Sequence, residues 1–495
     1  MLFNSYIFIF LFLPITLIGW YLFNKAKLYK SATLFLSLMS FWFYGYYNYY
    51  YLLILIGSIL INYFFSYLIK KTSQKGSKVF VKTVMLTGVT ANLLVLGIFK
   101  YYDFFVTNIN KIFCTNFNLR NIILPLGISF FTFQQISFVI DRYRGQCQHY
   151  SLVDYVAYVS FFPQLIAGPI VLHSEMIPQL VNYEKRKFDV ALFYEGCLYF
   201  SLGLAKKVLI ADFLGNVVDY FYTYAEYLDT PGAILIVITY AMQLFFDFSG
   251  YSDMAIGLGL LFGIRLPINF NSPYKAVSVK DFWRRWHITL GRFFTTYVYI
   301  PLGGNKKGVA RTIINVMIVF SLSGLWHGSE WSFVIWGILH GIGVALADIF
   351  SLIKKKSENK ICKKVGQIFT FIYVSLAFVF FRSDNVAQAV TVFKRLFSGT
   401  FYHAIRYATW EIKCPEVYLI TKILSMKANA YLTYWYLALY LFVLVLALVF
   451  SFKMSTKEII DKYRTKNAFA LICALFLVWS VISFSNVSKF LYFNF

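Results

Sequence analysis

Three of the chain's six histidines lie close together in its second half: His287, His327 and His340. Imidazole titrates near neutral pH and can act as a general base or as a nucleophile. His327 separates two apolar runs, Thr312–Leu325 and Trp331–Ala347. An ionisable side chain at membrane depth is costly and commonly marks a functional site. The alternative is a histidine that packs between helices and bonds a neighbouring carbonyl, and we favour function.

The elements that hold these histidines are membrane helices. The chain has 495 residues, of which 59% are hydrophobic and only 14% charged, whereas soluble domains average about 25% charged residues. Apolar runs of spanning length recur from end to end, which predicts an all-α polytopic membrane protein embedded in a lipid bilayer. A transmembrane β-barrel would show short alternating segments instead.

The net charge of +24 follows the predicted topology. Positive-inside distribution places the basic loops on the cytoplasmic side of a multi-pass protein of a cell membrane. No recognition motif accompanies the charge, so we expect no nucleic-acid partner. The six scattered cysteines predict neither a disulfide framework nor a zinc site. The basic loops are Lys70–Lys82, Arg265–Arg311, Lys354–Lys364 and Lys453–Lys466.

Hydropathy predicts a single membrane domain over residues 1–495. A turn near Trp326–Ser329 would place His327 at the deep end of a hairpin. Lys100–Arg120 is predicted to be an outer loop, and residues 382–430 are predicted to be an extracytoplasmic segment that is too polar to span. Apolar helices are expected at 4–23, 32–50, 52–69, 79–99, 125–145, twice or three times within 188–264, and at 312–325, 331–347, 366–381, 431–452 and 468–485.

Polar groups interrupt several of these helices. Gln134 and Gln135 either hold helices together or line a tunnel, because amides in a span must be bonded or meet water. Asp247 and Asp253 either pair with basic groups or line an aqueous vestibule, and pairing is favoured. Pro163, Gly168 and Pro169 break the apolar segment Ser160–Ile170, which we interpret as a re-entrant hairpin, with a kinked helix as the alternative.

The segment Arg265–Arg311 carries nine basic residues and one acid, Asp281. Aromatic and basic residues alternate over Phe282–Ile300, a pattern that suits helices lying in the cytoplasmic interface. Its arginines would either anchor lipid headgroups or bind the phosphates of an anionic cofactor. The candidate phosphate ligands are Arg284, Arg285 and Arg292.

Two further patterns are set aside. His327 and Glu330 could begin a metal site, but no H-E-x-x-H motif is present, and we expect no metal. Ser272–Lys275 matches S-x-x-K and Ser383–Asn385 matches S-D-N, yet no K-T-G follows and the topology puts the two on opposite sides of the membrane.

Four blocks of sequence resemble the membrane-bound O-acyltransferase (MBOAT) family: Pro125–Gly145, SFFPQLIAGPI, FWRRWHITLGRFFTTYVYIPLGG and GLWHGSEWSFVIWGILHG. These blocks define a motif core of about 125–345. The C-terminal VSKFLYFNF resembles the bacterial alginate O-acetyltransferase branch. Ser329-Glu330 departs from the smaller, neutral pair expected after GLWHG.

The resemblance implies a ring of about 11 transmembrane helices, with re-entrant and interfacial helices, around a funnel and tunnel. It implies that His287 and His327 are catalytic and that His340, Trp326, Gln134 and Gln135 are secondary or line the tunnel. The implied reaction moves acetyl from acetyl-CoA, a substrate and not a resident cofactor, to an extracytoplasmic polysaccharide. An exported SGNH-hydrolase-like partner would complete the transfer. Alternatives are D-alanyl transfer to teichoic acid from a carrier protein, or a transporter or channel without chemistry.

Overall fold

The computed structural model describes residues 1–74, 78–353, 359–401, 418–484 and 490–491. Over these ranges every regular element is a helix, which confirms the predicted fold class. The chain forms two compact units. The first contains residues 1–200 and 252–268, and the second contains residues 201–251 and 269–495. The single ring around a funnel and tunnel stays a prediction.

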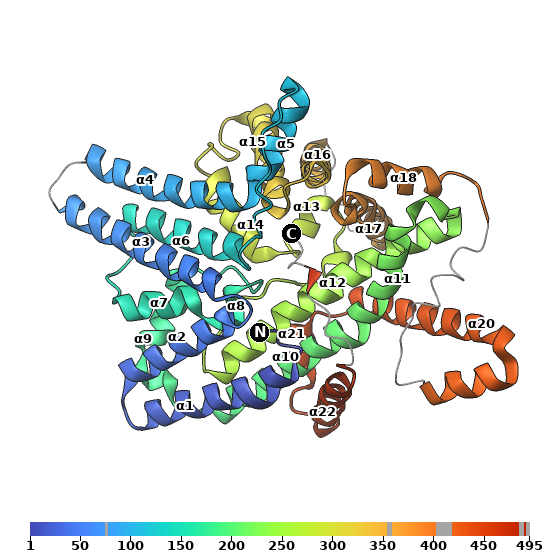
Figure 1. Ribbon diagram of the computed structural model, residues 1–495, viewed down its shortest axis with the longest axis horizontal. Coiled ribbons are helices and arrows are strands. Elements are labelled where there is room, and N and C mark those ends of the chain that lie inside the picture. The colour runs from blue at the N-terminus through green and yellow to red at the C-terminus, as the bar shows by residue number, and fades with distance from the viewer. Residues whose placement is uncertain (75–77, 354–358, 402–417, 485–489, 492–495) are drawn as a thin grey trace. The chain divides into compact units, whose positions relative to one another are not determined.

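The first unit is built mainly from helices α1 to α9 (Figure 1). Within it, α3, α4 and α6 pack side by side (Figure 1). Asn62 of α3 and Asn92 of α4 exchange amide hydrogen bonds of 3.0 and 2.6 Å, the kind of polar contact that joins helices in a membrane. The bounds are α1 Leu13–Lys25, α2 Tyr29–Gly45, α3 Tyr49–Ser73, α4 Lys78–Leu96, α5 Tyr102–Phe113, α6 Ile128–Tyr143, α7 Leu152–Ser160, α8 Phe162–Leu165 and α9 His173–Val181.

Helices α10 and α12 contribute residues to both units, and the remaining helices belong to the second unit. Their bounds are α10 Val190–Ala205, α11 Asp212–Thr223, α12 Thr230–Leu261, α13 Val279–Trp283, α14 Ile288–Phe294, α15 Gly308–His327, α16 Trp331–Ile353, α17 Lys360–Arg382, α18 Val386–Leu396, α20 Tyr418–Ser451, α21 Thr456–Tyr463 and α22 Asn467–Ile482. Short π-helical and 3-10 turns join several of them: Phe8–Phe12, Gly97–Tyr101, Tyr183–Arg186, Lys206–Ala211, Ala225–Tyr227, Pro273–Lys275 and Thr295–Tyr299.

Eight helical segments of the described chain are long and apolar enough to cross a membrane. This confirms a multi-pass protein, although the total of about 11 spans stays a prediction. The predicted helices at 32–50 and 468–485 are α2 and α22, which are shorter than 18 residues. The eight are Phe8–Lys25, Tyr49–Ser73, Lys78–Phe113, Thr230–Leu261, Gly308–His327, Trp331–Leu352, Lys360–Arg382 and Leu432–Ser451.

The predicted outer loop at Lys100–Arg120 is wrong in its first part. Helical backbone continues through a π turn at Gly97–Tyr101 and through α5 to Phe113. The acidic side chain of Asp103 lies in the first turn of α5 and Lys111 lies in its last, an arrangement that complements the helix dipole. Hydropathy does not detect this signal, because the segment mixes polar and aromatic residues.

The segment 382–430, predicted to be extracytoplasmic, contains helical structure, and its side of the membrane stays a prediction. Ser383 ends α17, and Asn385 caps a new amphipathic helix, α18, by accepting a hydrogen bond from the Gln388 N–H. Helix α20 begins at Tyr418, and its part Leu432–Ser451 is long and apolar enough to span. Residues 402–417 of the predicted segment lie outside the described residues.

The break in Ser160–Ile170 is confirmed. Helix α7 ends at Ser160, the four-residue α8 follows, and the buried chain then returns to α9, which packs on α7. The Gln164 side chain donates to the Tyr158 carbonyl at 2.7 Å, and the Tyr158 hydroxyl donates to the Val171 carbonyl at 2.9 Å. Side chains of the protein therefore bond backbone carbonyls that the broken helix leaves without helical partners. The depth of this segment in the membrane stays a prediction.

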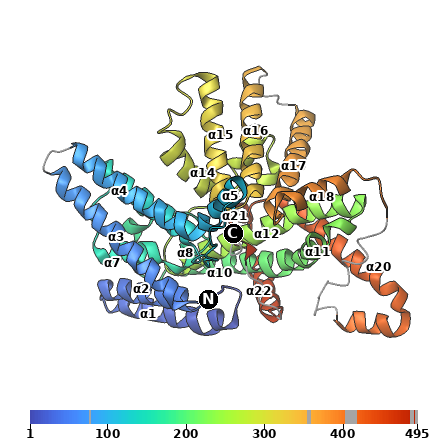
Figure 2. The same ribbon diagram turned by 45° about the horizontal axis from the view of Figure 1, so that its top comes forward.

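Helices α15, α16 and α17 stand side by side in the second unit (Figure 2). Two glycines bring the backbones of α15 and α16 into direct contact. A Cβ at Gly324 would lie 2.4 Å from the Phe333 carbonyl oxygen, and one at Gly337 would lie 2.3 Å from that of Phe320. Small residues at such a crossing allow the close backbone approach that stabilises membrane helix pairs. The crossing fixes the level of His327 at the end of α15.

Candidate active site

His287 lies at the start of α14 in an unusual backbone conformation. Its φ of 46° and ψ of 50° fall in the left-handed region, which costs free energy for a residue with a Cβ and persists only where its surroundings enforce it. The Ile288 N–H donates to the Asn269 carbonyl at 3.0 Å, and the Asn271 N–H donates to the Arg285 carbonyl at 2.9 Å. These two bonds hold the turn that carries His287 against the segment after α12.

The Asn269 side chain determines which nitrogen of His287 carries a proton. Its Oδ1 accepts hydrogen bonds from the Thr289 N–H at 3.2 Å and from the Thr289 hydroxyl at 2.9 Å. A backbone N–H can only donate, so the amide atom at this position must be the oxygen. His287 Nδ1 lies 3.2 Å from the same oxygen and must therefore donate. The proton of a neutral His287 sits on Nδ1, and Nε2 presents a lone pair.

Burial keeps His287 neutral. Its side chain is fully buried, and desolvation lowers the pKa of its imidazole from 6.5 to about 3. The Phe248 ring of α12 packs on it edge to face, with 4.8 Å between ring centroids. A neutral imidazole with an available lone pair at neutral pH is suited to accepting a proton.

His327 is the last residue of α15, and Gly328 follows in an extended conformation. The predicted hairpin turn is confirmed, because α16 begins at Trp331. The buried imidazole of His327 contacts the rings of Trp326, Trp336 and Phe381 with centroid separations of 4.8, 4.9 and 5.2 Å. The carboxyl end of a helix favours positive charge, so this position stabilises the imidazolium that a base would form.

The two histidines meet within the second unit. The centroids of the His287 and His327 rings lie 6.3 Å apart, and Trp326 lies 6.1 Å from His287. A direct hydrogen bond of about 3 Å between ring nitrogens would bring the centroids closer together. The spacing instead suits a reacting group that contacts both imidazoles. The predicted pairing of these histidines is therefore observed, although their catalytic roles are not tested by geometry alone.

His340 supports this pair from one layer away. Its Nδ1 accepts a hydrogen bond of 3.1 Å from the Trp283 indole N–H. The Trp336 ring lies between the two histidines of the hairpin, 4.9 Å from the centroid of His340 and 4.9 Å from that of His327. His340 thus contacts Trp336 and Trp283, and its secondary role stays a prediction.

The three predicted phosphate ligands differ in availability. Arg284 is exposed at the end of α13. Arg285 donates to the Asp281 carboxylate at 3.1 Å, so part of its guanidinium is already engaged. Arg292 is partly buried in α14. Arg284 and Arg285 lie in the turn between α13 and α14, Arg292 lies within α14, and Arg284 is the most open to an external anion.

The paired glutamines belong to the first unit. The Gln135 amide donates to the Ser58 hydroxyl at 2.8 Å and accepts from the Tyr155 hydroxyl at 3.3 Å. These contacts join α6 to α3 and α7, which favours the interpretation of Gln135 as a polar contact between helices. Gln134 is buried on the same helix, and a tunnel-lining role for either residue stays a prediction.

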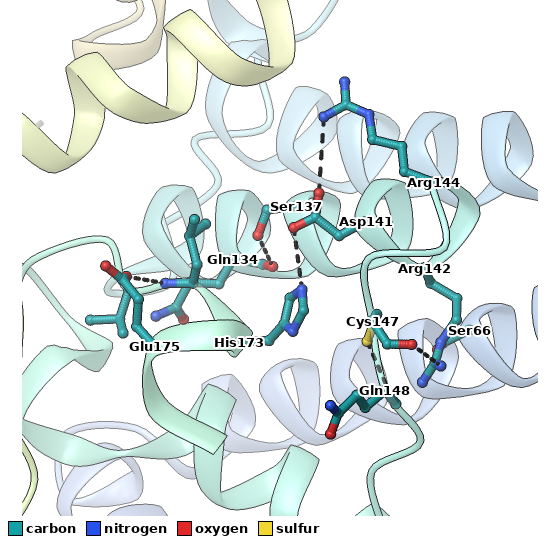
Figure 3. Close-up of polar contacts among 12 residues, drawn as sticks. Ser66, Gln134, Ser137, Asp141, Arg142, Arg144, Cys147, Gln148, His173 and Glu175 are labelled. Atoms are coloured by element: carbon teal, nitrogen blue, oxygen red, sulfur yellow. Dashed lines mark hydrogen bonds and ion pairs between the residues drawn. The ribbon is translucent and has the colours of Figure 1, made fainter. Parts of the chain in front are cut away.

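A second buried histidine cluster also lies in the first unit (Figure 3). The Asp141 carboxylate lies 3.2 Å from His173 Nε2, and the Tyr150 hydroxyl lies 3.3 Å from His173 Nδ1. Arg144 approaches the same carboxylate at 4.0 Å. These contacts attach α9 to the end of α6, so the cluster holds the broken segment in place. No spacing in the sequence relates His173 to Asp141.

Asp247 confirms the predicted pairing of intramembrane acids. Its carboxylate lies 2.6 Å from Lys207 Nζ, and Asp212 lies 2.7 Å from the same nitrogen. Both Lys207 and Asp247 are buried, and Asp247 also accepts from the Leu491 N–H at 3.0 Å. Asp253 is buried as well.

Comparison with known proteins decides the family. Residues 113–387 match the sequence profile of the membrane-bound O-acyltransferase family, and this range includes both His287 and His327. The chain belongs to that family. As an MBOAT protein it is an acyltransferase, and its helices make it a multi-pass membrane protein. The transporter alternative is not retained.

The curated relatives of this MBOAT protein are bacterial, in agreement with a place in the inner membrane. It is 43% identical over 80% of its length to a peptidoglycan O-acetyltransferase of Helicobacter pylori, of which 79% is covered. It is 37% identical over 83% of its length to a probable alginate O-acetylase of Pseudomonas aeruginosa, of which 76% is covered. A teichoic acid D-alanyltransferase of Streptococcus thermophilus is 30% identical over 49% of the chain and 60% of the relative.

Proposed function

We propose that this MBOAT protein transfers an acetyl group from cytoplasmic acetyl-CoA, across the bacterial cytoplasmic membrane, for O-acetylation of a cell-surface polysaccharide. The observation that carries the proposal is the pair of buried imidazoles, His287 and His327, with ring centroids 6.3 Å apart. Two relatives that each cover about 80% of the chain are named for O-acetyl transfer or as an O-acetylase, which supports acetyl as the transferred group.

In this mechanism His327 takes the proton of the acceptor hydroxyl as its oxygen attacks the thioester carbonyl. A C–O bond forms, the C–S bond breaks, and the proton passes from His327 to the departing thiolate. The helix end at His327 stabilises the intermediate imidazolium. The surrounding rings exclude water, which limits loss of the acyl group to hydrolysis.

The tautomer of His287 limits the part that this residue can play in the reaction. Polarising the thioester carbonyl requires a hydrogen-bond donor, whereas His287 Nε2 presents a lone pair because Asn269 holds the proton on Nδ1. His287 therefore orients the acceptor hydroxyl or receives a proton. The indole N–H of Trp326 can only donate, and we assign carbonyl polarisation to this residue.

Acetyl-CoA would approach from the side of the basic interfacial helices. Guanidinium groups bind phosphates with charge-assisted hydrogen bonds, and exposed Arg284 is the first candidate, followed by Arg285 and Arg292. On the opposite side, an exported SGNH-hydrolase-like partner would take the acetyl group to the polysaccharide. The positive-inside rule supports this direction, since the basic loops mark the cytoplasmic face.

The test is thioester turnover by the purified protein. The protein in lipid nanodiscs is incubated with acetyl-CoA, and free thiol is followed over time. We expect turnover that His327→Ala reduces by at least a hundredfold and that His340→Gln, a change outside the reacting pair, reduces far less. Equal rates for wild type and His327→Ala would overturn the proposed chemistry.

D-Alanyl transfer is the second candidate, because the S. thermophilus D-alanyltransferase shares the MBOAT core at 30% identity. Its donor would be a D-alanyl thioester on a carrier protein. The same assay with the two donors separates the candidates. Acetyl-CoA turnover below that of the D-alanyl carrier thioester would favour the second.

A further inference from the structure

A cavity of about 760 Å³ lies within the second unit, and one water molecule occupies only about 30 Å³ in the liquid. Most of its lining residues belong to α11, α12, the turn between α15 and α16, and the end of α17. The described lining is polar or charged except at Gly215, Phe333, Phe381 and Leu491. A space lined in this way holds water, because its side chains offer the polar partners that buried water requires.

The cavity communicates with solvent through several of its lining residues. Asp219 exposes 66% of its side chain and Asp384 exposes 77%, and Asn216 is exposed as well. All three line the cavity. Arg382 holds the two carboxylates near each other, since it donates to Asp219 at 2.7 Å and lies 3.9 Å from Asp384. Water from outside the protein can therefore enter the cavity.

One wall of the cavity is aromatic and lies against the proposed base. Phe333 and Phe381 line the cavity, and the centroids of their rings are 5.1 Å apart. The Phe381 ring also contacts the His327 imidazole, with 5.2 Å between centroids. His327 itself is only 3% exposed and is not among the described lining residues. The Phe381 ring therefore lies between the water-accessible cavity and the base.

The surrounding side chains hold the Phe381 ring in this place. The residue lies near the end of α17 and is 2% exposed. Its ring contacts that of Trp336 with centroids 4.9 Å apart, in addition to its contact with Phe333. Phe333 in turn packs against Gly328, where a Cβ would lie 2.1 Å from the Phe333 ring. Close packing on several sides keeps the ring from turning away from the base.

Water that reached His327 would compete with the acyl acceptor. A general base takes a proton from any hydroxyl in reach, and water is one. The water oxygen would then bond to the thioester carbonyl carbon and the C–S bond would break. The proton of the water would pass through His327 to the departing thiolate, so the products would be acetate and free thiol. An acyltransferase must exclude this side reaction by keeping water out.

We infer that Phe381 is a specificity-determining residue, which excludes the water of the cavity from the acyl thioester at His327 and so makes the protein a transferase and not a thioesterase. Removing the ring would join the cavity to the space beside the imidazole. Water there would have polar partners on both sides, in the cavity lining and at His327, and would enter. The inference rests on the proposed function, which places the acyl group at His327.

The test measures hydrolysis in the absence of any added acceptor. The full protein in nanodiscs is incubated with acetyl-CoA labelled in its acetyl group, and the rate of free acetate formation is recorded. We expect Phe381→Ala to form acetate at least tenfold faster than the wild type. Phe381→Leu removes less volume and should show a gain of at least threefold, which serves as the test if the alanine variant does not fold. Adding His327→Ala to either variant should abolish the gain.

Phe378→Ala is the matched control, because Phe378 lies one turn earlier on α17 and is 1% exposed. Its ring packs on Trp286 with centroids 5.4 Å apart, and it is not among the described lining residues. This variant should lose Tm and form acetate within twofold of the wild-type rate. Asn216→Trp places bulk in the cavity, so its addition to Phe381→Ala should remove at least half of the gain.

Three results would overturn the inference: acetate formation at the wild-type rate by folded Phe381 variants, an equal gain in Phe378→Ala, or a gain that persists without His327. Thiol release is recorded on the same preparations. Release that depends on His327, together with no gain from the Phe381 variants, refutes the water barrier alone. Wild-type release that His327→Ala does not reduce refutes the proposed function itself.

Discussion

Replacing Asn269 by alanine should change the reaction through His287, a residue that the substitution leaves in place. The Asn269 amide oxygen accepts from Thr289 twice and from His287 Nδ1 once, and the side chain is buried. Without this oxygen, His287 is free to move its proton from Nδ1 to Nε2. The lone pair that faces the reaction would then be replaced by an N–H.

The magnitude follows from the bonds that are lost. Removing one partner of a buried hydrogen bond costs about 1–3 kcal/mol, and the Thr289 hydroxyl can rotate to another acceptor. Two fixed donors thus predict destabilisation of about 2–6 kcal/mol. Losing a preference of about 1.4–2.8 kcal/mol for the reactive tautomer corresponds to a roughly ten- to hundredfold fall in kcat. KM for the thioester should stay within a factor of about two.

The assay is thiol release from acetyl-CoA at a temperature where each variant is folded, with Tm measured in parallel. Asn315→Ala is the matched control. Asn315 is an equally buried amide of the same unit, and it donates to the Gly304 carbonyl at 2.8 Å without contacting either catalytic candidate. It should lose stability and keep its rate. Asn269→Asp keeps an accepting oxygen and should recover most of the activity lost in Asn269→Ala.

The reasoning fails if Asn269→Ala turns over acetyl-CoA at the wild-type rate while folded. It fails equally if Asn315→Ala loses as much activity as Asn269→Ala, because the effect would then be one of stability alone.

Three further outcomes are expected. The pKa of His287 is about 3 when folded and 6.5 when unfolded. The free energy of unfolding is therefore unaffected by this group above pH 6.5 and falls by about 2 kcal/mol by pH 5, because the unfolded chain takes up the proton. Measured from pH 7 to pH 5, the Tm of His287→Gln should fall less than the Tm of the wild type. Trp283→Phe removes the donor to His340 and should cost about 1–2 kcal/mol of stability, with acyl transfer reduced less than threefold; a larger loss would place His340 in the reaction. Lys207→Met isolates buried Asp247 and should cost about 3–5 kcal/mol, whereas Lys207→Met/Asp247→Asn should recover much of the lost Tm; an unchanged Tm of the double variant would contradict the pairing.

The histidine pair and its hairpin are predictable from sequence because their signals are local. Two apolar runs flank His327, and the turn between them is short, so the end of α15 follows from hydropathy alone. The block around His287 carries the family resemblance in consecutive residues. The prediction of an outer loop from Lys100 is wrong because hydropathy reports lipid exposure. It does not report the charge placement in α5 that favours the helix.

The supporting groups are not predictable because their partners are distant in the chain. Asn269 contacts His287 and Thr289 only in the folded chain, where the turn before α14 packs against it. Pairing of Asp247 was expected, yet its partner Lys207 could not be chosen among many basic residues. Glu330 departs from the family pattern, and the carboxylates of Asp219 and Asp384 that line a cavity with it are distant in the sequence.

The glycine contact between α15 and α16 has a consequence for bilayers of different thickness. The level of His327 is set where Gly324 and Gly337 allow two backbones to touch, and that point is independent of how far either helix extends toward its basic end. Longer basic ends of α15 and α16 would accommodate a thicker membrane. The His327 imidazole then keeps its level relative to the crossing, so chains adapted to different lipids can share one arrangement of the two histidines.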